Sequence, residues 1–198
     1  MVDPQPSKGY PVKILCILGS PSPAAWSRRL ATAVADRLRV HDCEVDLLDL
    51  RDLPLAMLDT EAYGRGGVYP HEGARELRAR VAAADGVVLA TSVFHSSYSG
   101  LLKSALDHLE ADAFENKPVA LLANAGSERG ATIACEHLRS VVKALSGWAV
   151  PMQVASSQAD FDQETGQIKP GNVVRRCEIM CDELVKFIEA FSSLRVPR

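Results

Sequence analysis

The chain has 198 residues, and its 25 acidic residues slightly outnumber its 22 basic residues, which gives a net charge of −3 at pH 7. This length is sufficient to bury a sizeable core in one domain without disulfides. The charges are mixed along the chain, so no basic stripe for nucleic acid and no polybasic membrane anchor is present. The longest nearly uncharged stretch, 86–102, contains a histidine, a tyrosine and four serines, which argues against a membrane span.

The N-terminal residues 1–11 hold three prolines and no signal-peptide pattern, so we expect a disordered leader followed by one domain over 12–198. Five irregularly spaced cysteines suit a reducing compartment, and we expect a cytoplasmic protein. Cys177 and Cys181 would share a helix face, which permits a metal or redox pair. Because no further ligand pair at zinc spacing accompanies them, a structural role is favoured.

Apolar runs and helical periodicity predict alternating strands and helices. In chain order we expect a strand at Val12–Leu18, a helix around Leu30, Val34 and Leu38, a strand at Glu44–Leu50, a glycine-rich loop at Tyr63–Pro70, a helix at Glu72–Ala84, a strand at Gly86–Thr91, a helix at Leu101–Leu109, a strand at Pro118–Ala123, a helix at Ala131–Leu145, a strand at Ala149–Val154, a polar segment at Ser156–Gly171 and a helix at Val173–Leu194.

This alternation predicts an α/β fold, a flavodoxin-like doubly wound sheet of five parallel strands in the order 2-1-3-4-5 with helices on both faces. In such sheets ligands bind beyond the carboxyl ends of the strands, where the strand order reverses. The loops after the first, third and fourth strands should therefore border one crevice.

The first of these loops joins a strand to a helix N-terminus, whose free N–H groups and dipole attract phosphate. Ser20, Ser22 and Ser27 add hydroxyl donors, which favours a phosphate monoester. The loop matches neither G-x-G-x-x-G nor the Gly-Lys-Ser/Thr phosphate loop, so a mononucleotide is the better guest. Alternatively, Ser27 stands where an N-cap would and only caps the helix.

The second loop, Ser92–Gly100, combines aromatic residues with serines, and so offers both faces and hydrogen-bonding groups to a flat heteroaromatic ligand. For His95, a loop histidine without chemistry is favoured over a catalytic acid or base, because no carboxylate is placed to orient it. The third loop, Asn124–Gly130, offers glycines for close backbone approach and Ser127 as a donor, or it is a plain connector.

The segments ILGSPSPAAWSRRL, TSVFHSSYSGLLKSALDHL and LANAGSERG resemble the NAD(P)H-dependent FMN reductases of flavodoxin-like fold over residues 12–155. The likeness is nearest to the reductases that supply reduced flavin to two-component monooxygenases. The resemblance implies FMN as cofactor, NADPH or NADH as reductant, a flavin-dependent monooxygenase as partner, and a homodimer or homotetramer. By the same resemblance, FMN is bound by Ser20, Ser22, Ser27, Val93, Phe94, His95, Tyr98, Ser99, Ala125, Gly126 and Ser127.

The chain departs from the family pattern at four positions, one of which is Ala25, where the family has a second hydroxyl or amide residue. Ser22 stands where the family usually has a phosphate-binding arginine, while Ser92 and Phe94 replace the usual proline and tyrosine. Unless Arg28 or Arg29 turns back, the lost cation weakens FMN binding by roughly 1.5–3 kcal/mol. Weakly held FMN suits a flavin that acts as substrate.

Further residues have expected roles that follow from the resemblance or from position. Lys103 and Asp107 match a family pair that is structural or lies at a subunit contact, and Tyr98 borders a tetramer interface in the sulfonate-type reductases. Arg65 or Arg129 would meet the NADPH 2′-phosphate, although a solvated surface role is favoured for each. Leu101–Leu109 and Trp148 are candidates for a subunit contact.

The sequence thus predicts an NAD(P)H-dependent FMN reductase in which hydride passes from the nicotinamide to flavin N5. The protein positions the two rings, so no catalytic general base and no metal is required. Three alternatives stay open: a quinone, azo or metal-oxyanion reductase that retains FMN, a non-enzymatic electron carrier, and a relative recruited to specialised biosynthesis.

Overall fold

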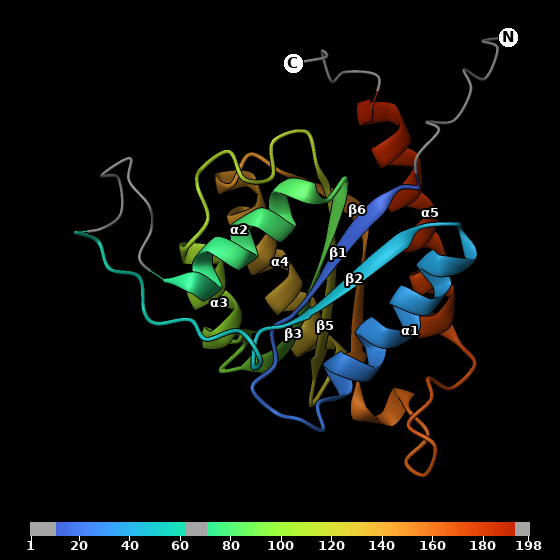
Figure 1. The fold of residues 1–198 in the computed structure, drawn as a ribbon. Coiled ribbons are helices and arrows are strands. Elements are labelled where there is room, and N and C mark those ends of the chain that lie inside the picture. Colours follow the sequence, from blue (N-terminus) through green and yellow to red (C-terminus); the bar gives the residue numbers. More distant parts are fainter. Residues whose placement is uncertain (1–10, 62–70, 193–198) are drawn as a thin grey trace, which may run out of the picture.

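A computed structural model describes residues 11–61 and 71–192 of the chain (Figure 1). Its elements are β1 (Lys13–Leu18), α1 (Trp26–Val40), β2 (Glu44–Asp49), α2 (Glu72–Ala83), β3 (Gly86–Phe94), β4 (Ser97–Tyr98), α3 (Gly100–Asp107), β5 (Pro118–Ala125), α4 (Glu128–Ala144), β6 (Trp148–Ser157), a 3₁₀ turn (Gln158–Asp160) and α5 (Asn172–Ser192). The predicted leader up to residue 10, the glycine-rich loop with Arg65, and the predicted helix end at Leu194 lie outside the described residues.

The sheet has the order β2-β1-β3-β5-β6, with neighbouring strands parallel, and the short β4 pairs antiparallel with β3. Figure 1 shows α1 and α5 on one face and α2, α3 and α4 on the other. The predicted doubly wound fold and its strand order are therefore confirmed. The prediction missed β4, a sixth strand that lies off the main strand order.

Alternate residues of the central strands enter two separate cores. In β1, Leu15 and Ile17 pack with the α2, α3 and α4 side chains, whereas Ile14, Cys16 and Leu18 pack with those of α1 and α5. Because successive side chains of a strand point to opposite faces, a strand covered on both faces must be apolar at nearly every position. This explains why the strands appear as uninterrupted apolar runs in the sequence.

Helix α4 ends as its sequence predicts. Its C-cap is Leu145, and Ser146 follows with φ of 62°, the left-handed conformation that commonly terminates a helix. Gly147 then passes so close to the Phe114 Cβ that a side chain there would lie 2.8 Å from it. Glycine is thus required by packing at the entry to β6.

Strand β6 forms one edge of the sheet, and side chains occupy several of its backbone groups. Arg139 of α4 donates to the carbonyls of Val150 and Pro151, at 3.1 and 2.9 Å. Glu183 of α5 accepts from the Met152 N–H at 2.7 Å. These contacts coincide with an irregularity in the pairing with β5, between Val119 and Leu121.

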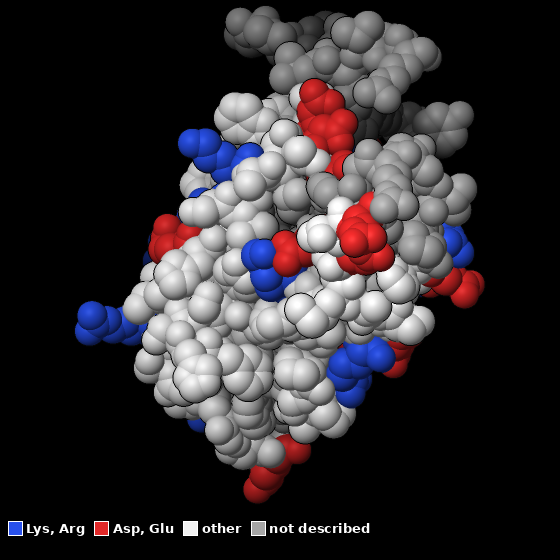
Figure 2. Space-filling model, turned by 90° about the vertical axis from the view of Figure 1, so that its left-hand side faces the viewer, with Lys and Arg blue, Asp and Glu red and all other residues white. Residues whose placement is uncertain are grey.

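The face that contains α2 and α3 carries its charged side chains as separate groups, with uncharged surface between them (Figure 2). Within residues 11–61 and 71–192, no helix is long and apolar enough to cross a membrane.

Candidate functional site

The carboxyl ends of β1, β3 and β5 lie side by side at the lower edge of the sheet in Figure 1. Each strand is followed by a short connection that leads to a helix, α1, α3 or α4 respectively. The three loops selected from the sequence are therefore neighbours. This is the switch-point geometry in which doubly wound sheets bind ligands.

The first loop begins at Gly19, whose N–H donates to the Ala90 carbonyl at 2.8 Å. A Cβ at Gly19 would lie 2.6 Å from the Leu102 Cβ, so only glycine lets β1 pass α3 at this distance. After it, Ser20 is buried and Ser22 is exposed. Close packing thus fixes the start of the loop and leaves its tip open.

Ser27 does not cap α1, contrary to the capping alternative. The N-cap is Ala25, with no side-chain hydrogen bond, and Ser27 lies in the first turn of the helix. The buried Ser27 hydroxyl instead shares a hydrogen bond of 3.0 Å with the Ser92 hydroxyl at the end of β3. No side chain of the N-cap therefore occupies the first N–H groups of α1, and they are suited to an anion.

The second loop contains a β-hairpin where the sequence predicted only a polar loop. β3 runs on to Phe94, and Val93 pairs with Tyr98 across the two-residue turn His95–Ser96. Both turn residues are left-handed, with φ of 50° and 63°. Two-residue turns of this kind usually carry Asn and Gly. Because His and Ser occupy these positions here, the usual pattern of a hairpin is missing from the sequence.

The hairpin side chains have unequal access to a ligand. Phe94 is 49% exposed and His95 is exposed, whereas Val93 and Tyr98 are partly buried and pack against the core. Ser97 shares a hydrogen bond of 3.0 Å with His137 Nδ1, which ties the hairpin to α4.

Ser99 is fully engaged within the protein. Its hydroxyl accepts from the Leu102 N–H at 3.0 Å, which caps α3, and donates to the Gly19 carbonyl. Its N–H donates to Thr91 Oγ1 at 3.0 Å. The hydroxyl of this candidate binding residue therefore joins the first loop to α3, and its backbone N–H joins them to β3.

The third loop presents Ala125, Gly126 and Ser127. A Cβ at Gly126 would meet no atom within 4 Å, so the backbone here is open to a ligand. Ser127 is the N-cap of α4 and accepts from the Gly130 N–H at 3.3 Å. Its hydroxyl proton is left over for an external acceptor.

Three polar residues at the strand ends were not among the predicted site residues. Ser92 is one, and the others are Asn124 and Ser156, buried partners in a hydrogen bond of 2.9 Å between Nδ2 and Oγ. Each lies within the last three residues of its strand, β3, β5 or β6, which is a signal that sequence reasoning had available.

Arg28 is the cation nearest the first loop. Its guanidinium pairs with the Asp49 carboxylate at the end of β2 and lies 3.5 Å from the Ser20 carbonyl. Burial raises the pKa of Asp49, but hydrogen bonds from Arg51 and Arg28 outweigh it and lower the pKa below its ordinary value. The carboxylate therefore stays charged and holds Arg28 beside the loop.

Arg29 stacks on an aromatic residue of its own helix. Its guanidinium lies 5.1 Å from the Trp26 ring centroid, and Trp26 in turn packs against Phe161. Gly166, with φ of 71°, lies against the same guanidinium, which a side chain at that position would overlap. Arg29 thus fastens the segment after β6 onto α1.

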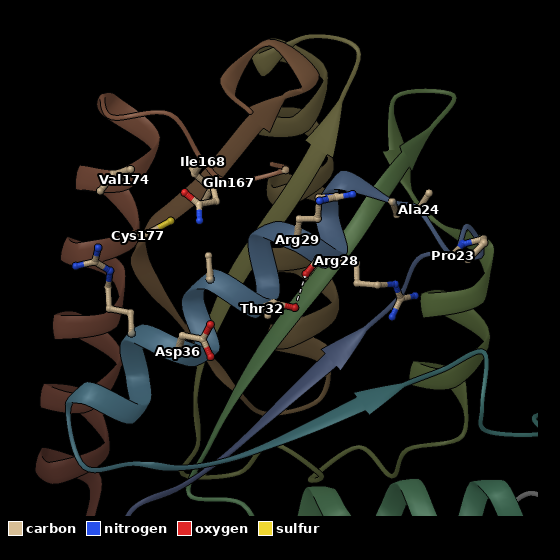
Figure 3. Close-up of a pocket in the computed structure, with 14 residues that line it drawn as sticks. Pro23, Ala24, Arg28, Arg29, Thr32, Asp36, Gln167, Ile168, Val174 and Cys177 are labelled. Atoms are coloured by element: carbon tan, nitrogen blue, oxygen red, sulfur yellow. Dashed lines mark hydrogen bonds between the residues drawn. The ribbon is translucent and has the colours of Figure 1, made fainter. Parts of the chain in front are cut away.

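A groove of about 580 Å³ runs along α1 and is lined by Thr32, Asp36 and Gln167 and, at the tip of the first loop, by Pro23 and Ala24 (Figure 3). It lies beside the Arg29 contact, on the solvent side of α1. At the predicted crevice itself, only a small void lies between Gly19, Ser27 and Ala90. The hydrogen-bond donors at the strand ends, and not the groove along α1, match the chemistry of a phosphate ligand.

Other candidate residues have structural surroundings. Lys103 and Asp107 form an ion pair of 2.6 Å one turn apart on α3. Leu102, Ala105, Leu106 and Leu109 are buried in the chain's own core, whereas Trp148 is 62% exposed. Arg129 is exposed in the first turn of α4.

All five cysteines are free and buried. Burial raises the pKa of Cys177 to about 11 and that of Cys181 to about 12, so neither is a thiolate at neutral pH. Within the described part of the chain, no group of three His, Cys, Asp or Glu residues is arranged to hold a metal ion.

Comparison with known proteins agrees with this geometry. The model of the NADPH-dependent FMN reductase family matches residues 12–161. The FMN-dependent NADPH-azoreductase of Staphylococcus aureus is 34% identical over 180 residues, which are 89% of this chain and 95% of the relative.

Two solved structures share the fold. An oxidoreductase from Corynebacterium diphtheriae superposes with a TM-score of 0.71 at 24% identity, over 91% of this chain and 98% of that one. The apo form of the NADH:FMN oxidoreductase EMOB gives 0.68 at 24% identity, over 90% and 89% of the two chains.

The strand order and the superpositions define a protein of flavodoxin-like α/β fold. More specifically, the chain belongs to the NADPH-dependent FMN reductase family, whose cofactor and reductant are FMN and NADPH.

Proposed function

We propose that this protein oxidises NAD(P)H and transfers the hydride to FMN bound at the ends of β1, β3 and β5. The observation that carries the proposal is the donor set of the first loop, where Ser20, Ser27 and the N-terminus of α1 converge. A helix N-terminus without a side-chain cap is suited to a phosphate monoester, the group that FMN carries.

The residues of the chain would act by binding and orientation. Ser20 and Ser22 would bind the phosphate through their hydroxyls and Ser27 through its backbone N–H in the first turn of α1, with Arg28 as the nearby cation. The backbone of Val93–His95, with Tyr98, would follow one edge of the flavin ring, and Ala125–Ser127 would flank it; Ser99 supports them through α3. When bound, FMN supplies the hydride-accepting N5, and catalysis requires the nicotinamide to stack on it in near-attack geometry.

The departure at Ser22 supports weak FMN binding and release of reduced FMN, which would serve a flavin-dependent monooxygenase. The azoreductase from Staphylococcus aureus supports a second candidate, in which FMN is retained and an azo compound is the acceptor. Both functions use the same site and differ in how long FMN stays there.

A steady-state assay separates the two functions. Purified protein is given NADPH or NADH with and without excess FMN, and nicotinamide absorbance and azo-dye colour are followed. Turnover that requires added FMN supports the reductase, and dye reduction by yellow protein without added FMN supports the azoreductase. The absence of flavin-dependent turnover with both nucleotides would refute the proposal.

A cytoplasmic location and a homodimer or homotetramer complete the proposal. Five reduced thiols support the location. The exposed Trp148, which packs edge-on against Phe191 at 5.7 Å, supports association through a surface at the start of β6. Light scattering coupled to size-exclusion chromatography tests the assembly.

A further inference from the structure

Three serine hydroxyls from distant parts of the chain form a continuous hydrogen-bonded chain at the end of the sheet. Ser92 Oγ lies 2.8 Å from Ser20 Oγ and 3.0 Å from Ser27 Oγ. Ser20 and Ser27 are 2% and 1% exposed, whereas Ser92 between them is partly exposed. Ser92 therefore joins two candidate phosphate-binding hydroxyls that do not contact each other directly in the described structure.

The direction of these hydrogen bonds follows from counting protons. Each hydroxyl has one proton to donate and can accept two hydrogen bonds. Ser92 donates to Ser20, so the bond between Ser92 and Ser27 must use the Ser27 proton. Ser20 also accepts from the Ser22 N–H at 3.3 Å. Within residues 11–61 and 71–192, the Ser20 hydroxyl thus accepts two hydrogen bonds and donates none.

A buried hydroxyl that donates nothing has its proton available for a ligand acceptor. Hydrogen bonds that run in one direction polarise one another, so the two upstream hydroxyls strengthen Ser20 as a donor. A phosphate oxygen is an acceptor only, which makes it the matching ligand atom. The flavin ring and the ribityl hydroxyls gain less from this polarisation, because they carry no comparable charge.

We propose that Ser92 is a positioning residue for the phosphate of FMN, orienting the Ser20 hydroxyl as a donor and so favouring phosphorylated flavin over riboflavin. This inference rests on the proposed function of the site. In this role Ser92, which stands where the family usually has proline, partly compensates for the phosphate-binding arginine that Ser22 replaces.

The alternative is that Ser92 merely braces β1 against β3. Other bonds already do so: Gly19 donates to the Ala90 carbonyl, Ser99 donates to the Gly19 carbonyl, and Ser99 also holds Thr91. Because these contacts remain when the Ser92 hydroxyl is removed, the strand ends should keep their positions.

The test compares Ser92→Ala, which removes the hydroxyl, with Ser92→Thr, which retains it. Dissociation constants for FMN and riboflavin are measured by quenching of flavin fluorescence. In S92A the FMN constant should rise about tenfold, the effect of one hydrogen bond to a charged group. The riboflavin constant should not change, and S92T should bind FMN as the wild type does. Ser104→Ala, at a half-buried serine of α3, is the matched control.

A second measurement does not depend on riboflavin binding. The ³¹P resonance of bound FMN should shift in S92A and return to its wild-type position in S92T. Equal weakening of both flavins, undiminished FMN binding, or an unchanged ³¹P resonance in S92A would overturn the role of Ser92.

Wild-type protein separates this inference from the proposed function. If the wild type neither binds FMN nor oxidises nicotinamide with it, the proposed function is wrong. If the wild type does both and the S92A substitution changes the FMN and riboflavin dissociation constants equally or leaves both unchanged, only the role of Ser92 is wrong. Unchanged circular dichroism and thermal unfolding of S92A establish that the fold is intact.

Discussion

The N-termini of α1 and α4 lie at the same edge of the sheet, and in each case the preceding strand is followed directly by a Gly-Ser pair, Gly19–Ser20 or Gly126–Ser127. Ser127 directly precedes α4 and caps it, whereas α1 begins after Ala25 with no side-chain cap. Ser20 is instead held by Ser92. The same dipeptide therefore caps α4, which it directly precedes. It leaves the first N–H groups of α1 available to a ligand, because it lies several residues before that helix.

The largest effect is expected at Gly19, and the equivalent glycine before α4, Gly126, serves as its control. Gly19→Ala would place a Cβ 2.6 Å from that of Leu102, which is fixed to the α3 backbone. We expect a loss of about 1–3 kcal/mol in the free energy of unfolding and a failure to bind FMN. Gly126→Ala, into open space, should change stability by less than about 0.5 kcal/mol. Urea unfolding of both variants checks this, and equal losses would contradict the difference in packing.

The next effect concerns the cation beside α1. Arg28→Ala should weaken FMN binding about tenfold, because Asp49 then faces the phosphate with less compensation. Arg29→Ala is the control, since Arg29 lies on Trp26 and should leave the FMN dissociation constant unchanged. Fluorescence titration at constant ionic strength measures both, and a larger effect at Arg29 would show that the loop cation is misassigned.

Removal of the α4 cap should have a moderate effect. Ser127→Ala leaves the Gly130 N–H without its acceptor and should lower the free energy of unfolding by about 1 kcal/mol. Ser22→Ala, at an exposed residue before α1, should leave stability unchanged. Chemical denaturation distinguishes them. Equal stability of the two variants would mean that the cap contributes nothing.

The smallest and most informative change gives α1 the cap that α4 already has. Ala25→Ser should raise the free energy of unfolding of the FMN-free protein by about 0.5–1 kcal/mol. Because the new hydroxyl occupies N–H groups proposed for the phosphate, FMN affinity should fall. Stability and FMN affinity that rise together would disprove the idea that cap and ligand compete.

The fold was predictable because its signals are local. Apolar runs identify the strands, and their regular alternation with segments of helical periodicity indicates a doubly wound parallel sheet. The hairpin was not predictable, since His95 and Ser96 adopt left-handed conformations without the usual Asn-Gly signal. The link between Ser20 and Ser92 spans 72 positions, and only the folded sheet brings these residues together.

The neighbouring positions of the three loops were predictable from the sequence, but the contacts of their individual serines were not. Ser27 and Ser99 both precede or begin helices, and sequence alone could not tell which of them caps one. The structure has Ser99 as the cap of α3 and Ser27 as a partner of Ser92. This difference depends on tertiary contacts that no local pattern encodes.

The side chains that cover β6 also constrain how copies of this protein can associate. Arg139 and Glu183 already occupy the carbonyls of Val150 and Pro151 and the N–H of Met152. A neighbouring chain cannot add a strand along that part of the edge without first displacing both ionic side chains. Along this part of β6, continuation of the sheet by a second copy is therefore disfavoured.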